Sequence, residues 1–110
     1  MPTPGTVLWQ IAHLEHSARH YAEIIRQRPM SEEPITPPPS TRVLEDLLTA
    51  LYQAHAHFRE VIAELAENDV NQPCARGMNV AEFIRMAVRH STWRASQIAT
   101  VRRLYRYHCC

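Results

Sequence analysis

The sequence predicts an all-α protein built as an up-down bundle of three long helices. Three observations support this prediction. Glycine is rare, with 2 residues among 110, and most of the 8 prolines fall in two short stretches. Between these breaks, apolar residues recur every three or four positions, the spacing of one face of a helix. Each such segment also follows residues of the types that cap helix N-termini.

The first helix is predicted over about residues 6–27, with Thr3 or Thr6 as its cap. One face carries the apolar residues Val7, Leu8, Ile11, Leu14, Ala18, Tyr21, Ala22 and Ile25. The opposite face is not plainly solvated, because it holds Trp9, His13, His16, His20 and Ile24. This two-sided pattern predicts that the first helix contacts other groups on both sides.

The second helix is predicted over about residues 41–68, with Ser40 or Thr41 as its cap. It has the cleanest apolar stripe of the chain, formed by Val43, Leu44, Leu47, Leu48, Leu51, Ala54, Phe58, Val61, Ile62 and Leu65. The proline-rich residues 28–40 before it cannot continue a helix, so they are predicted to be a loop. A ligand for an adaptor domain is the alternative interpretation of this loop.

The third helix is predicted over about residues 80–107, after a turn at 69–78. Asn79 and Glu82 have the spacing of a capping box. The apolar stripe consists of Val80, Phe83, Ile84, Ala87, Ile98, Val101 and Tyr105. His90, Arg94 and Gln97 fall on or beside this stripe. A charge there is costly unless it is paired or bound, so the helix either meets a polar site or lacks part of its cover.

Composition limits the classes of function. The chain is long enough for one domain, 1–110, and its formal charge of +1 gives no broad basic surface for nucleic acid. No apolar run approaches the ~18 residues of a membrane span. The 3 cysteines form no disulfide framework, which favours a cytoplasmic protein.

A bundle of helices this long usually has four members. The two-sided first helix and the polar groups on the third stripe both indicate an uncovered face. We therefore expect a homodimer, in which a second copy completes the bundle. The alternative is a longer form of the protein with another helix at its N-terminus.

Histidine is the residue type that points to chemistry here. Zinc, nickel and iron bind imidazole, and a catalytic centre uses about three protein ligands. His13 and His16 have the spacing of neighbours on a helix, and His90 could join them in a mononuclear site. The other interpretation is that the 7 histidines are structural or solvated. The sequence contains no glycine-rich phosphate loop and no nucleophile elbow.

Three segments resemble a known family. The segment Val7–Leu14 resembles the Trp-x-x-x-His segment on the second helix of DinB-like (YfiT-like) four-helix-bundle proteins. The segments Asn79–Ile84 and His90–Ile98 resemble the last helix of that family, whose pattern is His-x-x-x-His-x-x-Gln-Ile. The resemblance spans nearly the whole chain, in the order of the family's second to fourth helices. It implies a DinB-like bundle that lacks the family's first helix.

The resemblance also implies a metal site. Three histidines of the family's second and last helices hold a divalent ion, and members of known activity include thiol-dependent S-transferases and isomerases. By position, His13 and His90 match two ligands, and Gln97 matches the glutamine of the pattern. The third ligand position holds Arg94, which stays protonated and repels a cation.

Two functional hypotheses follow. In the first, the metal site is degenerate and the protein is a non-catalytic binding or structural module. Arg94 then pairs with a carboxylate or with a small anionic or thiol ligand, in a pocket that includes Trp9 and Gln97. In the second, the protein is a divalent-metal-dependent thiol S-transferase or hydrolase. His13 and His90 then bind the ion, with His16 or a partner residue as third ligand. An unrelated helical adaptor remains the third possibility.

Overall fold

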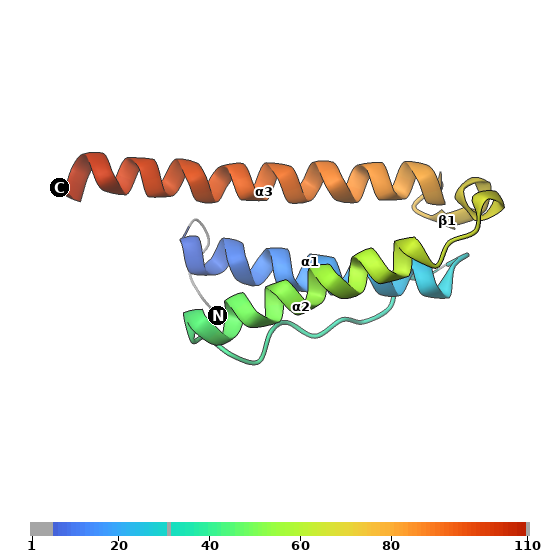
Figure 1. Cartoon of the computed structure of the whole chain (residues 1–110), viewed down its shortest axis with the longest axis horizontal. Helices are drawn as coiled ribbons and strands as arrows, with labels where there is room; N and C mark the ends of the chain where they lie inside the picture. Colours follow the sequence, from blue (N-terminus) through green and yellow to red (C-terminus); the bar gives the residue numbers. More distant parts are fainter. Residues whose placement is uncertain (1–5, 31, 110) are drawn as a thin grey trace.

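The computed structural model describes residues 6–30 and 32–109, with side chains up to residue 104. This part of the chain folds into the α-helices α1 (Val7–Gln27), α2 (Leu44–Ala63) and α3 (Val80–Cys109). A 3₁₀ helix, η1 (Glu67–Asn71), and the strands β1 (Pro73–Ala75) and β2 (Met78–Asn79) join α2 to α3 (Figure 1). The predicted all-α bundle is confirmed. None of the described helices is both long enough and apolar enough to cross a membrane.

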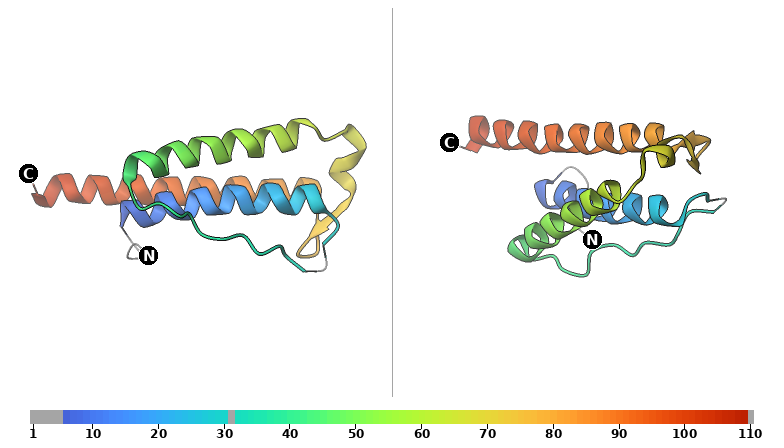
Figure 2. Two further views of the ribbon diagram at one scale, coloured as in Figure 1. Left: turned by 90° about the horizontal axis from the view of Figure 1, so that it is seen from below. Right: turned by 45° about the vertical axis from the view of Figure 1, so that its right-hand side comes forward.

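The three helices do not simply alternate in direction, as the predicted up-down order requires. α1 and α2 run in the same direction, and α3 runs opposite to both (Figure 1). The reason is the segment 28–43, called the linker below, which returns along the length of α1 before α2 begins (Figure 2). Its prolines prevent a second turn of helix, so the chain crosses the molecule as a loop.

Two of the predicted helix caps are confirmed. The backbone N–H of Trp9 donates to Oγ1 of Thr6 at 3.1 Å, which satisfies one of the free amides at the start of α1. At the start of α3, Glu82 N–H donates to Oδ1 of Asn79 at 2.8 Å, and Asn79 N–H donates to Oε1 of Glu82 at 3.1 Å. This reciprocal pair is the predicted capping box.

The second helix is shorter than the predicted range 41–68. It begins after Val43, whose apolar side chain cannot make a capping hydrogen bond, so the predicted cap at Ser40 or Thr41 is wrong. The hydroxyl of Thr41 instead accepts from Val43 N–H, ahead of the helix. At the other end, Glu64 N–H bonds back to the carbonyl of Glu60, and the chain turns into η1. Leu65 packs against the core from this turn, so its burial does not require the helix to continue.

A tight hairpin stands where the sequence predicted only a turn. β1 and β2 pair antiparallel, and the connecting residues Arg76 and Gly77 have φ angles of 56° and 73°. Glycine adopts such a left-handed conformation without the steric cost that a Cβ brings. The hairpin also holds the linker, because Met30 N–H donates to the carbonyl of Cys74 at 2.9 Å.

The core is built around α1, which packs against both α2 and α3. Its C-terminal half supplies Tyr21, Ala22, Ile24 and Ile25, and the opposing residues include Val61 of α2 and Val80, Phe83 and Ala87 of α3. Ile24 was predicted on the back of α1, yet it is fully buried. The two-sided pattern of α1 therefore reflects its position between the other two helices and beside the linker.

The linker covers the histidine-bearing side of α1. Nε2 of His16 lies 2.8 Å from the carbonyl oxygen of Thr36, and Nδ1 of His20 lies 2.9 Å from the Thr36 hydroxyl. Glu33 accepts from Arg76 of the hairpin and lies 2.9 Å from Nε2 of His20. These contacts explain the polar back of α1 within one chain, so that pattern gives no support to a dimer.

Candidate functional site

The antiparallel packing of α1 and α3 brings together residues that are far apart in the sequence. The rings of Trp9 and His13, one helical turn apart on α1, stack with centroids 5.0 Å apart and an interplanar angle of 12°. The edge of this stack meets α3, where the ring of His90 lies 5.3 Å from that of His13. The predicted proximity of His13 and His90 is therefore observed.

His90 is held from both of its nitrogens. Nε of Arg94 donates to Nε2 of His90 at 3.5 Å, a long hydrogen bond. The hydroxyl of Tyr21 lies 3.3 Å from Nδ1 of the same ring. A guanidinium can only donate, so Nε2 must be the acceptor, and the neutral imidazole carries its proton on Nδ1, facing Tyr21.

Arg94 lies between two indole rings. Its guanidinium carbon is 5.1 Å from the ring centroid of Trp9 and 4.6 Å from that of Trp93, within the range of cation–π attraction. Nη1 also donates to Oε1 of the buried Gln10 at 3.5 Å. Among the described residues, no carboxylate lies within ion-pair distance of Arg94. The predicted carboxylate partner is therefore not found within the described chain.

Both histidines of this cluster are kept neutral. The pKa of His13 is lowered to about 4, first by burial, then by the nearby positive charge of Arg94, and to a smaller extent by His90 and His16. Burial and then the charges of Arg94 and Arg76 lower the pKa of His90. At pH 7 the charge of the cluster therefore resides on Arg94.

His16 and Gln97 do not join the cluster. The ring of His16 points to the linker, where it contacts Thr36 and stacks on His20 with centroids 5.9 Å apart. Gln97 is half-buried farther along α3, and no hydrogen bond within the described chain connects it to the other site residues. His16, which the sequence offered as a third metal ligand, therefore contacts the linker and His20 and does not contact His90.

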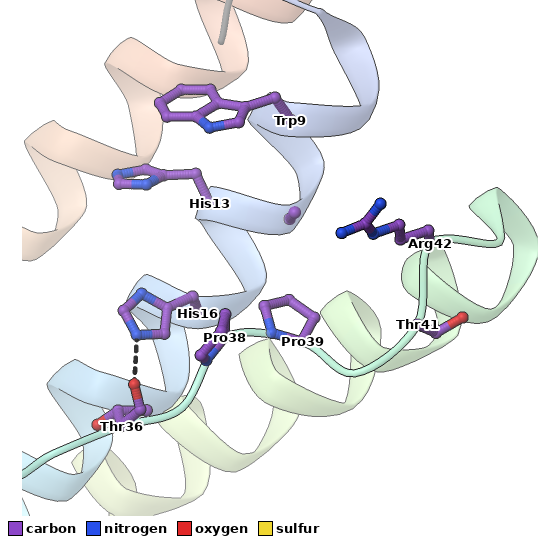
Figure 3. Close-up of a pocket in the computed structure, with 9 residues that line it drawn as sticks. Trp9, His13, His16, Thr36, Pro38, Pro39, Thr41 and Arg42 are labelled. Atoms are coloured by element: carbon purple, nitrogen blue, oxygen red, sulfur yellow. Dashed lines mark hydrogen bonds between the residues drawn. The ribbon is translucent and has the colours of Figure 1, made fainter. Parts of the chain in front are cut away.

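A pocket of about 430 Å³ opens beside the Trp9–His13 stack. It lies between α1 and the linker (Figure 3). Its lining residues are Trp9, Ala12, His13, His16, Thr36, Pro38, Pro39, Thr41 and Arg42. Figure 3 shows the guanidinium of Arg42 directed toward α1 from the linker side. The pocket is large enough for a small organic molecule, and it combines apolar rings with one positive group.

The residues of the cluster do not fit a metal ion held by three protein ligands. No group of three or more His, Cys, Asp or Glu side chains with metal-binding geometry occurs in the part of the chain that the structure describes. His13 and His90 are neighbours, but Arg94 stands where a third ligand is needed, and its charge opposes a cation.

The comparison with protein families agrees with this arrangement of helices. The family model of the DinB superfamily matches residues 1–98. The chain belongs to the DinB superfamily. Searches of the curated proteins and of the solved structures gave no significant match. The matched range of this DinB chain contains all of α1 and α2, and in α3 it includes the whole cluster around Arg94.

Several residues of this DinB site were not predicted from the sequence. Gln10 interrupts the apolar side of α1, and that interruption is a signal that could have found it. Tyr21 was assigned to the core only, although its hydroxyl reaches His90. Trp93 and Arg42 carry no local signal, because their roles depend on how α3 and the linker pack against α1.

Proposed function

We propose that this DinB protein is a non-catalytic binding module in which Arg94 replaces the metal ion. The observation that carries the proposal is the 3.5 Å approach of Arg94 Nε to Nε2 of His90. A metal would need the lone pair of that nitrogen, and the arginine side chain faces it instead. The same arginine brings a permanent positive charge into a cluster of neutral rings.

The ligand that best suits the site is a small anion with an apolar body. The adjoining pocket offers the faces of Trp9, Pro38 and Pro39 for an apolar group, and the guanidinium of Arg42 for a carboxylate or sulfonate. No carboxylate of the described chain pairs with Arg42, so this charge is available to a ligand. The second positive group, Arg94, lies on the ring of Trp9.

Calorimetric titration with 2-naphthoate tests this ligand class, with the neutral 2-naphthol as its matched control. Binding of the anion should weaken about ten-fold in Arg42→Gln, because a charge-assisted hydrogen bond is lost. Trp9→Ala should weaken it as well, whereas Arg102→Gln and Trp93→Ala, which lie outside the pocket, should not. Glutathione in the same titration tests a thiol ligand. Equal binding of naphthoate and naphthol would refute an anion site.

Elemental analysis and one substitution test the degenerate metal site. Purified, untagged protein should contain far less than one zinc, nickel or iron per chain. Arg94→His should then bind about one nickel or zinc in a titration, because it supplies a third imidazole beside His13 and His90. Arg94→Gln is the control, since it removes the charge without adding a ligand. If Arg94→His binds no metal, the pocket does not have the family's ligand geometry.

The alternative is a divalent-metal-dependent thiol S-transferase or hydrolase that uses His13 and His90. The observation in its favour is that both imidazoles have lowered pKa values and lie in ring contact, as neutral ligands of one ion would. This alternative requires His16 or a partner residue to complete the site. About one metal per chain in the wild-type protein, lost in His13→Ala and in His90→Ala, would support it over the binding module.

A further inference from the structure

A second surface of the molecule shares no lining residue with the pocket beside Trp9, and it meets the Arg94 cluster at Tyr21. A groove of about 550 Å³ runs between α2 and α3, with α1 beneath it. Its lining residues are Ala18, Tyr21, Leu48, Leu51, Tyr52, His55, Phe58, Arg59, Val88, Ser91 and Thr92. In Figure 1 these two helices flank α1 along this stretch. Side chains of another helix can pack into a groove between two helices.

The walls of this groove expose large apolar side chains. Leu48 and Tyr52 of α2 are 46% and 72% exposed, and Val88 of α3 is 53% exposed. α2 packs against α1, and its residue Leu47 is completely buried. The apolar stripe predicted for α2 is therefore wider than the surface that α1 covers. Exposed apolar residues gathered along one groove mark a site of association.

The charges on this face of α2 are arranged symmetrically about Tyr52. Glu45 lies seven residues before Tyr52 and Arg59 lies seven residues after it. Seven residues are close to two helical turns, so the three side chains point in similar directions over roughly 21 Å of helix. Within the described chain, neither Glu45 nor Arg59 takes part in an ion pair. An identical helix laid antiparallel across Tyr52 would place each acid opposite a base.

We infer that a second copy of this chain occupies the groove, with the two α2 helices antiparallel and Tyr52 at the two-fold axis. Leu48 and Tyr52 of each copy fill the groove of the other, where Val88 completes the apolar contact. Glu45 of each copy pairs with Arg59 of the partner, so the interface contains this ion pair twice. Such a contact is isologous and closes on itself, as a two-fold dimer requires.

The self-complementary charge pattern selects a second copy over an unrelated partner. An unrelated helix would need a base near Glu45 and an acid near Arg59, and nothing in this chain requires that arrangement. A copy of α2 supplies both charges at the correct separation by symmetry alone. Opposite charges placed in this way fix the register and the direction of two helices more than they add affinity.

Charge reversal tests the pairing, with the mass in solution measured by analytical ultracentrifugation over a range of concentrations. The wild-type protein should be a dimer. Glu45→Lys and Arg59→Glu should each raise the dissociation constant of the dimer about ten-fold or more, because two attractive pairs become repulsive. The double variant with both reversals should restore it. Asp46→Lys is the matched control, since Asp46 is also exposed and lies in the same turn, about 100° around α2 from Glu45.

A cross-link tests the position of the symmetry axis. Tyr52→Cys, made with Cys109→Ser and Cys110→Ser, should be joined into a covalent dimer by a short bis-maleimide. Cys74 is buried and does not compete. Asp46→Cys in the same background should give no cross-linked dimer, because the two copies of that residue would lie far apart.

Several outcomes would overturn the inference. A wild-type protein that is monomeric at all concentrations would exclude a second copy as the occupant. A dimer whose double variant is not restored, although circular dichroism shows it folded, would exclude the antiparallel α2 pairing. A dimer with cross-linking at residue 46 but not at 52 would place the interface on a different face.

Discussion

Arg94 and His90 stand one helical turn apart on α3, and the guanidinium Nε donates to the imidazole Nε2 at 3.5 Å. This contact determines the state of the whole cluster. It leaves the Nδ1 proton of His90 for Tyr21, and it occupies the lone pair of Nε2 that a metal ion would need. Burial lowers the pKa of His13 and of His90 most, and the charge of Arg94 lowers both as the next cause, so both rings stay neutral at pH 7. The consequences can be measured one at a time.

Replacing Arg94 by alanine should lower the free energy of unfolding by about 1 kcal/mol, through the loss of its contacts with two indole rings and Gln10. The loss is modest because no described carboxylate is left unpaired. Urea unfolding measures it. Arg89→Ala is the control and should change stability by less than about 0.5 kcal/mol, because Arg89 is exposed on α3 and has no ion pair with any described residue. A loss of ~3 kcal/mol or more would indicate a buried ion pair.

The tautomer of His90 is a second prediction. Because Nε2 accepts from Arg94, the neutral ring should carry its proton on Nδ1, which is the less common form in solution. Long-range proton–nitrogen correlation spectra above pH 7 distinguish the two tautomers. In Arg94→Ala no guanidinium donates to Nε2 of His90, so the population of the Nε2-protonated form should rise. A wild-type ring protonated mainly on Nε2 would contradict the described hydrogen bond.

The ionic contact between linker and hairpin predicts a pH dependence of stability. Hydrogen bonds from Arg76 and then from His20 lower the pKa of Glu33 from 4.5 to about 2. The unfolded chain therefore takes up a proton before the folded one as the pH falls. The stabilisation is complete above pH 4.5 and is lost as the pH falls toward 2.

Thermal midpoints between pH 5.5 and pH 2.5 measure this effect. Glu33→Gln should be less stable than the wild type at pH 5.5, and the difference should shrink at pH 2.5. Glu32→Gln is the matched control, because Glu32 is the exposed neighbour and has no described ion pair. A constant difference between Glu33→Gln and the wild type across this range would show that the carboxylate makes no such contact.

The core centred on α1 predicts where large truncations are most damaging. Phe83 is fully buried and packs edge-on against Tyr21, with ring centroids 5.5 Å apart. Phe83→Ala should cost about 3–5 kcal/mol, since it removes a buried ring and leaves a cavity. Leu104→Ala, on an exposed part of α3, should cost less than about 0.5 kcal/mol. Urea unfolding of both variants tests the contrast.

The sequence by itself determined the fold class and two helix starts, and its family resemblance implied that His13 and His90 share one site. These features follow from periodicity and capping, which act over a few residues, and from the family resemblance. The sequence also placed Arg94 on an apolar stripe, and in the structure Arg94 contacts His90, Gln10 and both indole rings of the site.

Only the tertiary structure decided how the faces are covered. The direction of α2 depends on the path of the linker, which no local pattern specifies. Two histidines at the back of α1, His16 and His20, therefore contact Thr36 and Glu33 of the linker. The exposed face lies on α2 instead, where the apolar stripe is wider than the surface of α1 that packs on it. Periodicity shows which residues share a face, but long-range packing determines what that face meets.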